Sequence, residues 1–137
     1  MNEAHTEQLY RECPILFGDH TKSMRETCMC WGFECGDGWF DLIFTLSRKI
    51  EAIVTKLPTE ERPVAMQVKE KFGGLRFYMT SHHDEIEKLI SQAEYDSERT
   101  CETCGKPGTL HTDGWWRCLC DICEDAYQTK RRSRTKT

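Results

Sequence analysis

Long apolar runs are missing from this sequence of 137 residues. No stretch approaches the ~20 apolar residues that a membrane-spanning helix needs. The opening residues, Met-Asn-Glu-Ala-His, lack the charged-then-apolar pattern of a secretory signal peptide, and no internal repeat precedes residue 130. We therefore expect one modest domain, with at most a small appendage, in the cytoplasm and without a membrane partner.

A net positive charge is also absent. The chain carries 19 basic and 23 acidic residues, a formal net charge of −4, which argues against general binding of polyanions. The distribution is uneven, because residues 130–137 hold five basic side chains and no acidic one. We expect this basic tail to be disordered. The alternative is an arm that contacts nucleic acid or an acidic protein face.

Cysteine, in contrast, is plentiful, with nine residues in the chain. Without an export signal, so many cysteines indicate reduced thiols and metal ligands rather than disulfides. Charged residues make up 31% of the chain and hydrophobic residues 38%. This balance is typical of a globular protein with a thin core.

Four of the cysteines have the spacing of a zinc site. Cys101 and Cys104 form one Cys-x-x-Cys pair, and Cys120 and Cys123 form a second pair after fifteen intervening residues. Each pair can present two thiolates to one ion, and Zn²⁺ prefers four soft ligands in a tetrahedron. The sequence thus predicts one structural, four-coordinate Zn²⁺. Two redox dithiols or a disulfide framework are the alternatives.

The residues around these pairs predict the shape of a zinc finger over residues 100–129. Gly105 suits a knuckle after the first pair, and Asp113-Gly114 is a hairpin turn signal. Acidic residues after Cys120 fit the first turn of a helix. Knuckle, hairpin and helix together resemble a treble-clef finger, with a plain zinc ribbon as the alternative. We expect Trp115 and Trp116 to dock it on the rest of the protein.

Residues 1–99 are expected to form an α+β body. Apolar residues recur at alternating four- and three-residue steps from Trp39 to Leu57, which predicts a long amphipathic helix that ends at Pro58. A helix over residues 3–12 is compatible with the sequence. A further helix is expected to begin near Ser81 and Asp84, which resemble a capping box, and to end near Ser97.

Between these helices, residues 64–80 predict a two-stranded hairpin with Gly73-Gly74 as its two-residue loop. This register pairs Phe72 with Leu75 and Glu70 with Phe77. One face is then apolar and is expected to cover the long helix; it comprises Val64, Met66, Val68, Phe72, Leu75, Phe77 and Met79. The register leaves Glu70 on that apolar face without an evident role.

Three blocks of the sequence are together similar to a known group of proteins. They are Cys-Trp-Gly-Phe-Glu-Cys-Gly-Asp-Gly-Trp (30–39), Lys-Glu-Lys-Phe-Gly-Gly-Leu-Arg-Phe-Tyr (69–78) and the cysteine-rich block 101–123. The group consists of small, uncharacterised zinc-finger proteins of bacteriophages and prophages. The resemblance covers about residues 28–125. It implies a phage setting, and hence the cytoplasm of a bacterial host, but little chemistry.

A second metal site is conceivable at Cys28, Cys30 and Cys35. Cys-x-Cys-x4-Cys is not a standard ligand spacing, however, and free cysteine is among the most buried residue types. Nucleophilic catalysis by Cys35 with a histidine is also conceivable, but nothing in the sequence brings such a pair together. We therefore expect a protein without enzymatic activity.

The candidate contact residues follow from charge and aromatic character. The polar face of the hairpin, the tryptophan pair and the tail could contact nucleic acid or a protein partner; these residues are Lys69, Lys71, Arg76, Tyr78, Trp115, Trp116, Arg117, Lys130, Arg131 and Arg132. The preferred hypothesis is a zinc-binding accessory protein that binds a host protein, with inhibition of a defence or nucleic-acid enzyme as one possible outcome. The alternative is a nucleic-acid-binding zinc finger that uses the hairpin face and the tail.

Overall fold

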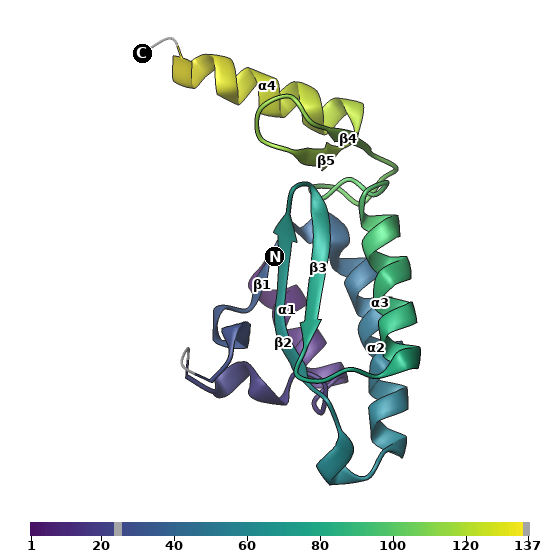
Figure 1. The fold of residues 1–137 in the computed structure, drawn as a ribbon. Coiled ribbons are helices and arrows are strands. Elements are labelled where there is room, and N and C mark those ends of the chain that lie inside the picture. Colours follow the sequence, from purple (N-terminus) through teal and green to yellow (C-terminus); the bar gives the residue numbers. More distant parts are fainter. Residues whose placement is uncertain (24–25, 136–137) are drawn as a thin grey trace.

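The computed structural model describes residues 1–23 and 26–135, and it shows an α+β fold with a cysteine-rich module at one end (Figure 1). The helices are α1 (Glu3–Glu12), α2 (Phe40–Lys56), α3 (Asp84–Ser97) and α4 (Asp121–Thr135). The strands are β1 (Phe33–Glu34), β2 (Ala65–Lys71), β3 (Gly74–Met79), β4 (Thr109–His111) and β5 (Arg117–Leu119). Short 3-10 helices cover Gly18–Thr21, Cys28–Trp31, Asp37–Trp39 and Thr59–Glu61.

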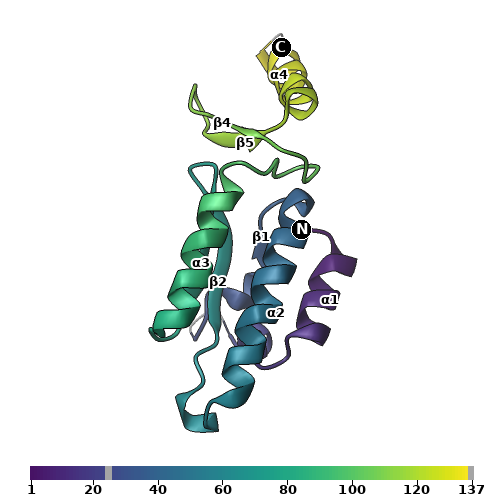
Figure 2. The ribbon, with the colours of Figure 1, turned by 90° about the vertical axis from the view of Figure 1, so that its right-hand side faces the viewer.

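Helix α2 is the centre of the body, as its periodicity predicted. Its apolar stripe is buried, including Ile43, Ile50 and Val54, because residues at these spacings share one face of a helix. Figures 1 and 2 show α3 on one side of α2 and α1 on the other, with the main sheet packed against them. None of the described helices is long and apolar enough to cross a membrane.

The main sheet has three strands in the order β1-β2-β3, whereas the sequence predicted two. Strand β1 pairs parallel to β2, with Phe33 opposite Val68. A strand of two residues has no periodicity of its own, so the pattern of Phe33 and Glu34 was too short to reveal it. The buried ring of Phe33 extends the core beside the hairpin.

The β2–β3 hairpin closes one residue earlier than predicted, at Phe72-Gly73. Glu70 pairs with Leu75 and Lys71 with Gly74, so the predicted pairing of Phe72 with Leu75 is wrong. Both loop residues have positive φ, 54° at Phe72 and 78° at Gly73, as type I′ turns require. The Glu70 carboxylate accepts a hydrogen bond of 2.8 Å from the Gly73 amide, which gives this residue the role that the sequence did not reveal.

A β-bulge between Ala65 and Gln67 changes which residues face the core. The extra residue shifts the alternation of side chains, so Ala65 is buried and Met66 is 42% exposed. The sequence placed Met66 and Phe72 on the core face, and both predictions are wrong. Phe72 lies in the turn and is 60% exposed.

Helix α3 covers the free edge of β3 with polar side chains. The Ser97 hydroxyl accepts a hydrogen bond of 2.8 Å from the Leu75 amide, and the Glu94 carboxylate accepts one of 3.3 Å from the Phe77 amide. These bonds satisfy edge amides that would otherwise be unpaired. The helix begins with His83 as its N-cap, so the predicted capping role of Ser81 is wrong.

The cysteine-rich module docks on the body through backbone contacts. The Gly38 amide donates a hydrogen bond of 2.8 Å to the Glu102 carbonyl, and the Gly36 amide donates one of 2.8 Å to the Glu102 carboxylate. The indole of buried Trp39 donates one of 2.8 Å to the Thr100 carbonyl. Gly36 and Gly38 thus let two backbones approach closely, and Trp39 adds a hydrogen bond to the same junction.

The predicted docking through the tryptophan pair holds only for Trp116. Its ring meets that of Phe72 edge to face, with centroids 5.9 Å apart, whereas Trp115 is 71% exposed. Helix α4 extends as far as Thr135, which differs from the expected disordered tail over residues 130–137. Residues 136–137 of that tail lie outside the described part of the chain.

Candidate metal centre

The four predicted ligands come from two local structures. Cys101 and Cys104 lie in a knuckle after α3, where Gly105 has a φ of 83°. The chain then forms the antiparallel β4–β5 hairpin. Cys120 follows β5, and Cys123 lies in the first turn of α4. The hairpin thus returns the chain to the knuckle, and it brings two pairs of thiols together across fifteen residues.

The sulfur positions suit a tetrahedral metal ion. All four Sγ atoms lie within 4.8 Å of one another, and those of Cys104 and Cys120 are 3.6 Å apart. Four sulfurs at ~2.3 Å from one Zn²⁺ would be roughly 3.8 Å apart. A disulfide would require sulfurs at ~2.05 Å, and all nine cysteines are free thiols. The four cysteines can therefore hold one metal ion.

Backbone amides favour the thiolate form of Cys101. Burial by itself would raise the pKa of Cys101, but hydrogen bonds from the backbone amides of Cys120, Cys104 and Thr103 lower that pKa to about 7. At Cys123, burial and hydrogen bonds with the neighbouring thiols raise the pKa to about 12. Four close thiols cannot all ionise unless a cation compensates them, and a divalent metal supplies that charge.

Comparison with protein-family models, with curated proteins and with solved structures finds no match for this chain. The functional argument therefore depends on the geometry of the molecule.

Arg117 was a candidate contact residue, but its guanidinium is turned inward. It is 5% exposed, and it forms an ion pair with Glu124 of α4 through two hydrogen bonds, one of them 2.9 Å long. It also donates to the carbonyls of Asp113 and Trp115, at 2.9 and 2.8 Å, and it stacks on the ring of Tyr127. Arg117 thus joins the β4–β5 turn to α4, and it is not available to a partner.

The second metal site that was conceivable from the sequence finds no support in the structure. Within residues 1–23 and 26–135, the C-terminal cysteines are the one group of three or more His, Cys, Asp or Glu side chains placed to hold an ion. Cys28, Cys30 and Cys35 do not form such a group. Burial raises the pKa of Cys35 to about 12, and the negative charge of Glu102 contributes to that rise. The raised pKa disfavours the thiolate that a ligand or nucleophile needs.

The predicted polar face of the hairpin exists, but its charge is balanced. The register places Lys69, Lys71, Arg76 and Tyr78 on one face of β2 and β3. Glu34 of β1 pairs with Lys69 in the parallel register. The guanidinium of Arg76 lies near the Glu94 carboxylate, whose pKa is raised mainly by burial and lowered in part by that arginine. The face therefore carries carboxylates beside its basic groups.

The remaining candidates lie elsewhere. Lys130, Arg131 and Arg132 are exposed on α4, which lies across the β4–β5 hairpin from the main sheet (Figure 1). The structure thus does not bring these residues together with the hairpin face. It does bring the two hairpin tips together, and the sequence did not predict this.

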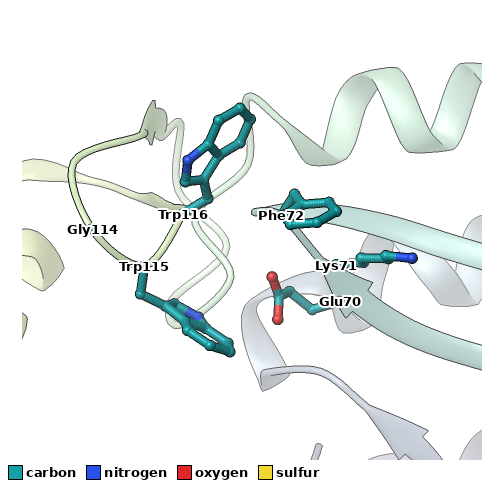
Figure 3. A pocket seen from close by; sticks show the side chains of 6 residues that line it. All are labelled: Glu70, Lys71, Phe72, Gly114, Trp115 and Trp116. Carbon is teal, nitrogen blue, oxygen red and sulfur yellow. The ribbon is translucent and has the colours of Figure 1, made fainter.

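The two tips enclose an aromatic cleft of about 620 Å³ (Figure 3). It is lined by Glu70, Lys71, Phe72, Gly114, Trp115 and Trp116. Sequence reasoning named the tryptophans as contact residues but assigned Phe72 to the core. The available signal was the position of Phe72 directly before a Gly-Gly pair, where a turn can expose it.

Proposed function

We propose that this protein is a zinc-binding protein without enzymatic activity that acts by binding a partner protein. The observation that carries the proposal is the cluster of four thiols within 4.8 Å. Zn²⁺ is the metal that best suits four cysteine ligands at tetrahedral spacing. The order of knuckle, hairpin and helix supports a treble-clef finger. A helix-borne ligand, Cys123, favours that form over a plain ribbon.

The role of the metal would be structural. Four protein thiolates leave no open coordination position for water or substrate. The module also buries few apolar side chains: among its described residues they are Cys101, Cys118 and Leu119. So small a core stabilises little by itself, and metal binding would supply much of the folding free energy.

Binding of a host protein in the cytoplasm is the function we propose for the whole molecule. The resemblance to bacteriophage and prophage proteins supports this setting. The net charge of −4 supports association with a basic surface, because complementary charge speeds encounter and disfavours wrong partners. Occupation of the basic site of a defence or nucleic-acid enzyme is one form that such binding would take.

Metal analysis of purified protein tests the zinc proposal. We expect one zinc per chain by elemental analysis, and loss of that zinc when Cys120 and Cys123 are both changed to Ser. The matched control changes Cys28 and Cys30 to Ser, and this variant is expected to keep one zinc. A metal-free protein, or equal zinc in both double variants, would contradict the proposal.

Affinity capture tests the partner proposal separately. The zinc-loaded chain is immobilised and exposed to bacterial lysate, with the Cys120→Ser, Cys123→Ser variant as the matched bait. A specific host protein retained by the first bait and lost from the second is the expected result. If no protein distinguishes the two baits, partner binding through the zinc-stabilised fold is wrong.

Nucleic-acid binding is the second candidate function. The shared face of Lys69, Lys71 and Arg76 favours it, whereas the neighbouring carboxylates and the inward-facing Arg117 oppose it. Binding to phosphates should weaken linearly in a plot of log K against log salt, and Lys71→Glu with Arg76→Glu should abolish it. An absence of DNA and RNA binding even at low salt would exclude this function.

A further inference from the structure

The aromatic cleft between the two hairpin tips is a preformed feature of the fold. A Cβ atom built on Gly73 would lie 2.4 Å from Cδ1 of Leu110 and 3.2 Å from the Arg117 amide, so the tip of the β2–β3 hairpin touches strands β4 and β5 at this glycine. Arg117 in turn fixes the carbonyls of Asp113 and Trp115. Both walls are therefore held in place without a ligand, which lowers the entropic cost of binding.

Phe72 is an unexpected residue for its position. Its φ of 54° is costly for a bulky side chain, and Asn or Gly is preferred at the first position of such a turn. Its ring is also 60% exposed, so burial does not offset the cost. Neither the turn nor the core explains an aromatic residue here, and among the side chains that the structure describes the one aromatic ring that Phe72 meets is that of Trp116 in the facing hairpin. Residues that violate local backbone preferences are concentrated at functional sites.

The tryptophans add to the same exposed surface. Trp115 is 71% exposed and Trp116 is 43% exposed, and in Figure 3 their rings lie on either side of the space that Phe72 and Glu70 enter. Three large aromatic rings from two separate hairpins thus share one open cleft. Aromatic residues gathered in this way are typical of the anchor points of interfaces.

The charged group that points into the cleft is a carboxylate. Figure 3 shows the Glu70 carboxylate pointing into the space between the hairpins, whereas the Lys71 ammonium points away from the tryptophans. The Lys71 Nζ lies 5.6 Å from the centroid of the Phe72 ring. One oxygen of Glu70, Oε2, accepts the Gly73 amide, and Oε1 has no hydrogen-bond partner within the described residues. That oxygen is available to a donor from outside.

We propose that this cleft binds a cationic side chain, the guanidinium of arginine or the ammonium of lysine, presented by the partner protein. The faces of aromatic rings attract cations, and the Glu70 carboxylate would complete the site with a charge-assisted hydrogen bond. A nucleic-acid base would also stack on the rings, but its phosphates would meet the carboxylate. The inference depends on the proposed partner-binding function, since it names the chemistry that the partner offers.

The direct test is titration of the zinc-loaded full chain with capped pentapeptides of the form Gly-Gly-X-Gly-Gly, followed by NMR. We expect the Trp115 and Trp116 indole signals to shift with Arg or Lys at X, and not with Gln, norleucine or Glu. A single anchored side chain should bind weakly, with a Kd on the order of 1 mM. Charge reversal at X should abolish the effect.

Variants then separate binding from folding. Glu70→Gln keeps an acceptor for the Gly73 amide, and Phe72→Asn suits the turn better than Phe does. Both variants should fold, and each should bind the Arg peptide about threefold to tenfold more weakly than the unaltered chain. Trp115→Ala should weaken binding of the Arg peptide to a similar extent. The matched controls are Glu60→Gln and Trp31→Ala, at exposed positions outside the cleft, and they should bind like the unaltered chain.

Three results would overturn the inference. Equal binding of the norleucine and Arg peptides would identify an apolar groove. Shifts induced by oligo-dT that Trp115→Ala removes, without shifts by the Arg peptide, would identify a stacking site for nucleic acid. A captured host protein whose binding survives Glu70→Gln and Trp115→Ala would refute the cleft as the partner site, while the proposed function would stand. A metal-free protein would refute the zinc proposal instead.

Discussion

Replacement of Gly38 by alanine tests how the body and the cysteine-rich module are joined. A Cβ atom at this position would lie 2.2 Å from the Cys101 carbonyl oxygen and 2.6 Å from both the carbon and the oxygen of the Glu102 carbonyl. All three are backbone atoms, so no side chain can rotate away. The two parts must separate or deform, and the 2.8 Å hydrogen bond from Gly38 to Glu102 weakens with them.

The expected magnitude follows from three contributions. Overpacking in a close contact costs about 1–3 kcal/mol, and loss of one hydrogen bond costs about 0.5–1.5 kcal/mol. Alanine also restricts the unfolded chain, which stabilises by about 0.4–1 kcal/mol, since the φ of Gly38 is not positive. The free energy of unfolding should therefore fall by about 2 kcal/mol, within a range from about 0.5 to about 4 kcal/mol.

Urea denaturation, followed by tryptophan fluorescence and far-UV circular dichroism, measures this difference. The matched control is Gly18→Ala, because no atom lies within 4 Å of a Cβ at Gly18, and it should be neutral or slightly stabilising. Gly38→Ala should keep its zinc, since Gly38 is no ligand. If the two variants unfold within ~0.5 kcal/mol of each other, a limit set by the additivity error of such comparisons, the backbone contact does not hold the module.

Two further predictions concern polar groups that are buried or partly buried. Arg117→Met removes the arginine that pairs with the Glu124 carboxylate, and it should lower the free energy of unfolding by about 3–5 kcal/mol. Arg48→Met removes an exposed ion pair with Glu12, and it should cost less than about 1 kcal/mol. Similar losses for the two variants in thermal denaturation would contradict the role assigned to Arg117. Burial raises the pKa of Glu94, so its ionised form destabilises the fold at pH values above the folded pKa, and this penalty disappears as the pH falls below the unfolded value. Glu94→Gln keeps an acceptor for the Phe77 amide, and it should raise the melting temperature at pH 7 but not at pH 3.5; an equal shift at both values would disprove the burial argument.

The sequence by itself determined the local elements and the metal ligands. The long helix was predictable because its apolar residues repeat with the period of a helix over five turns, from Trp39 to Leu57. The four-thiol cluster was predictable because two Cys-x-x-Cys turns each place a pair of sulfurs on one ion, whatever surrounds them. These features depend on spacing along the chain.

Only the tertiary structure decided which segments meet. The third strand, the bulge at Ala65 and the turn at Phe72-Gly73 depend on pairing across the sheet, which local propensity does not encode. Burial of Arg117 depends on α4 crossing its hairpin. The cleft needs the tip of the β2–β3 hairpin to touch the β4–β5 hairpin, at Gly73 and Leu110, which are 37 residues apart in sequence. Contacts of this kind arise from packing between elements, so a pattern within one element cannot reveal them.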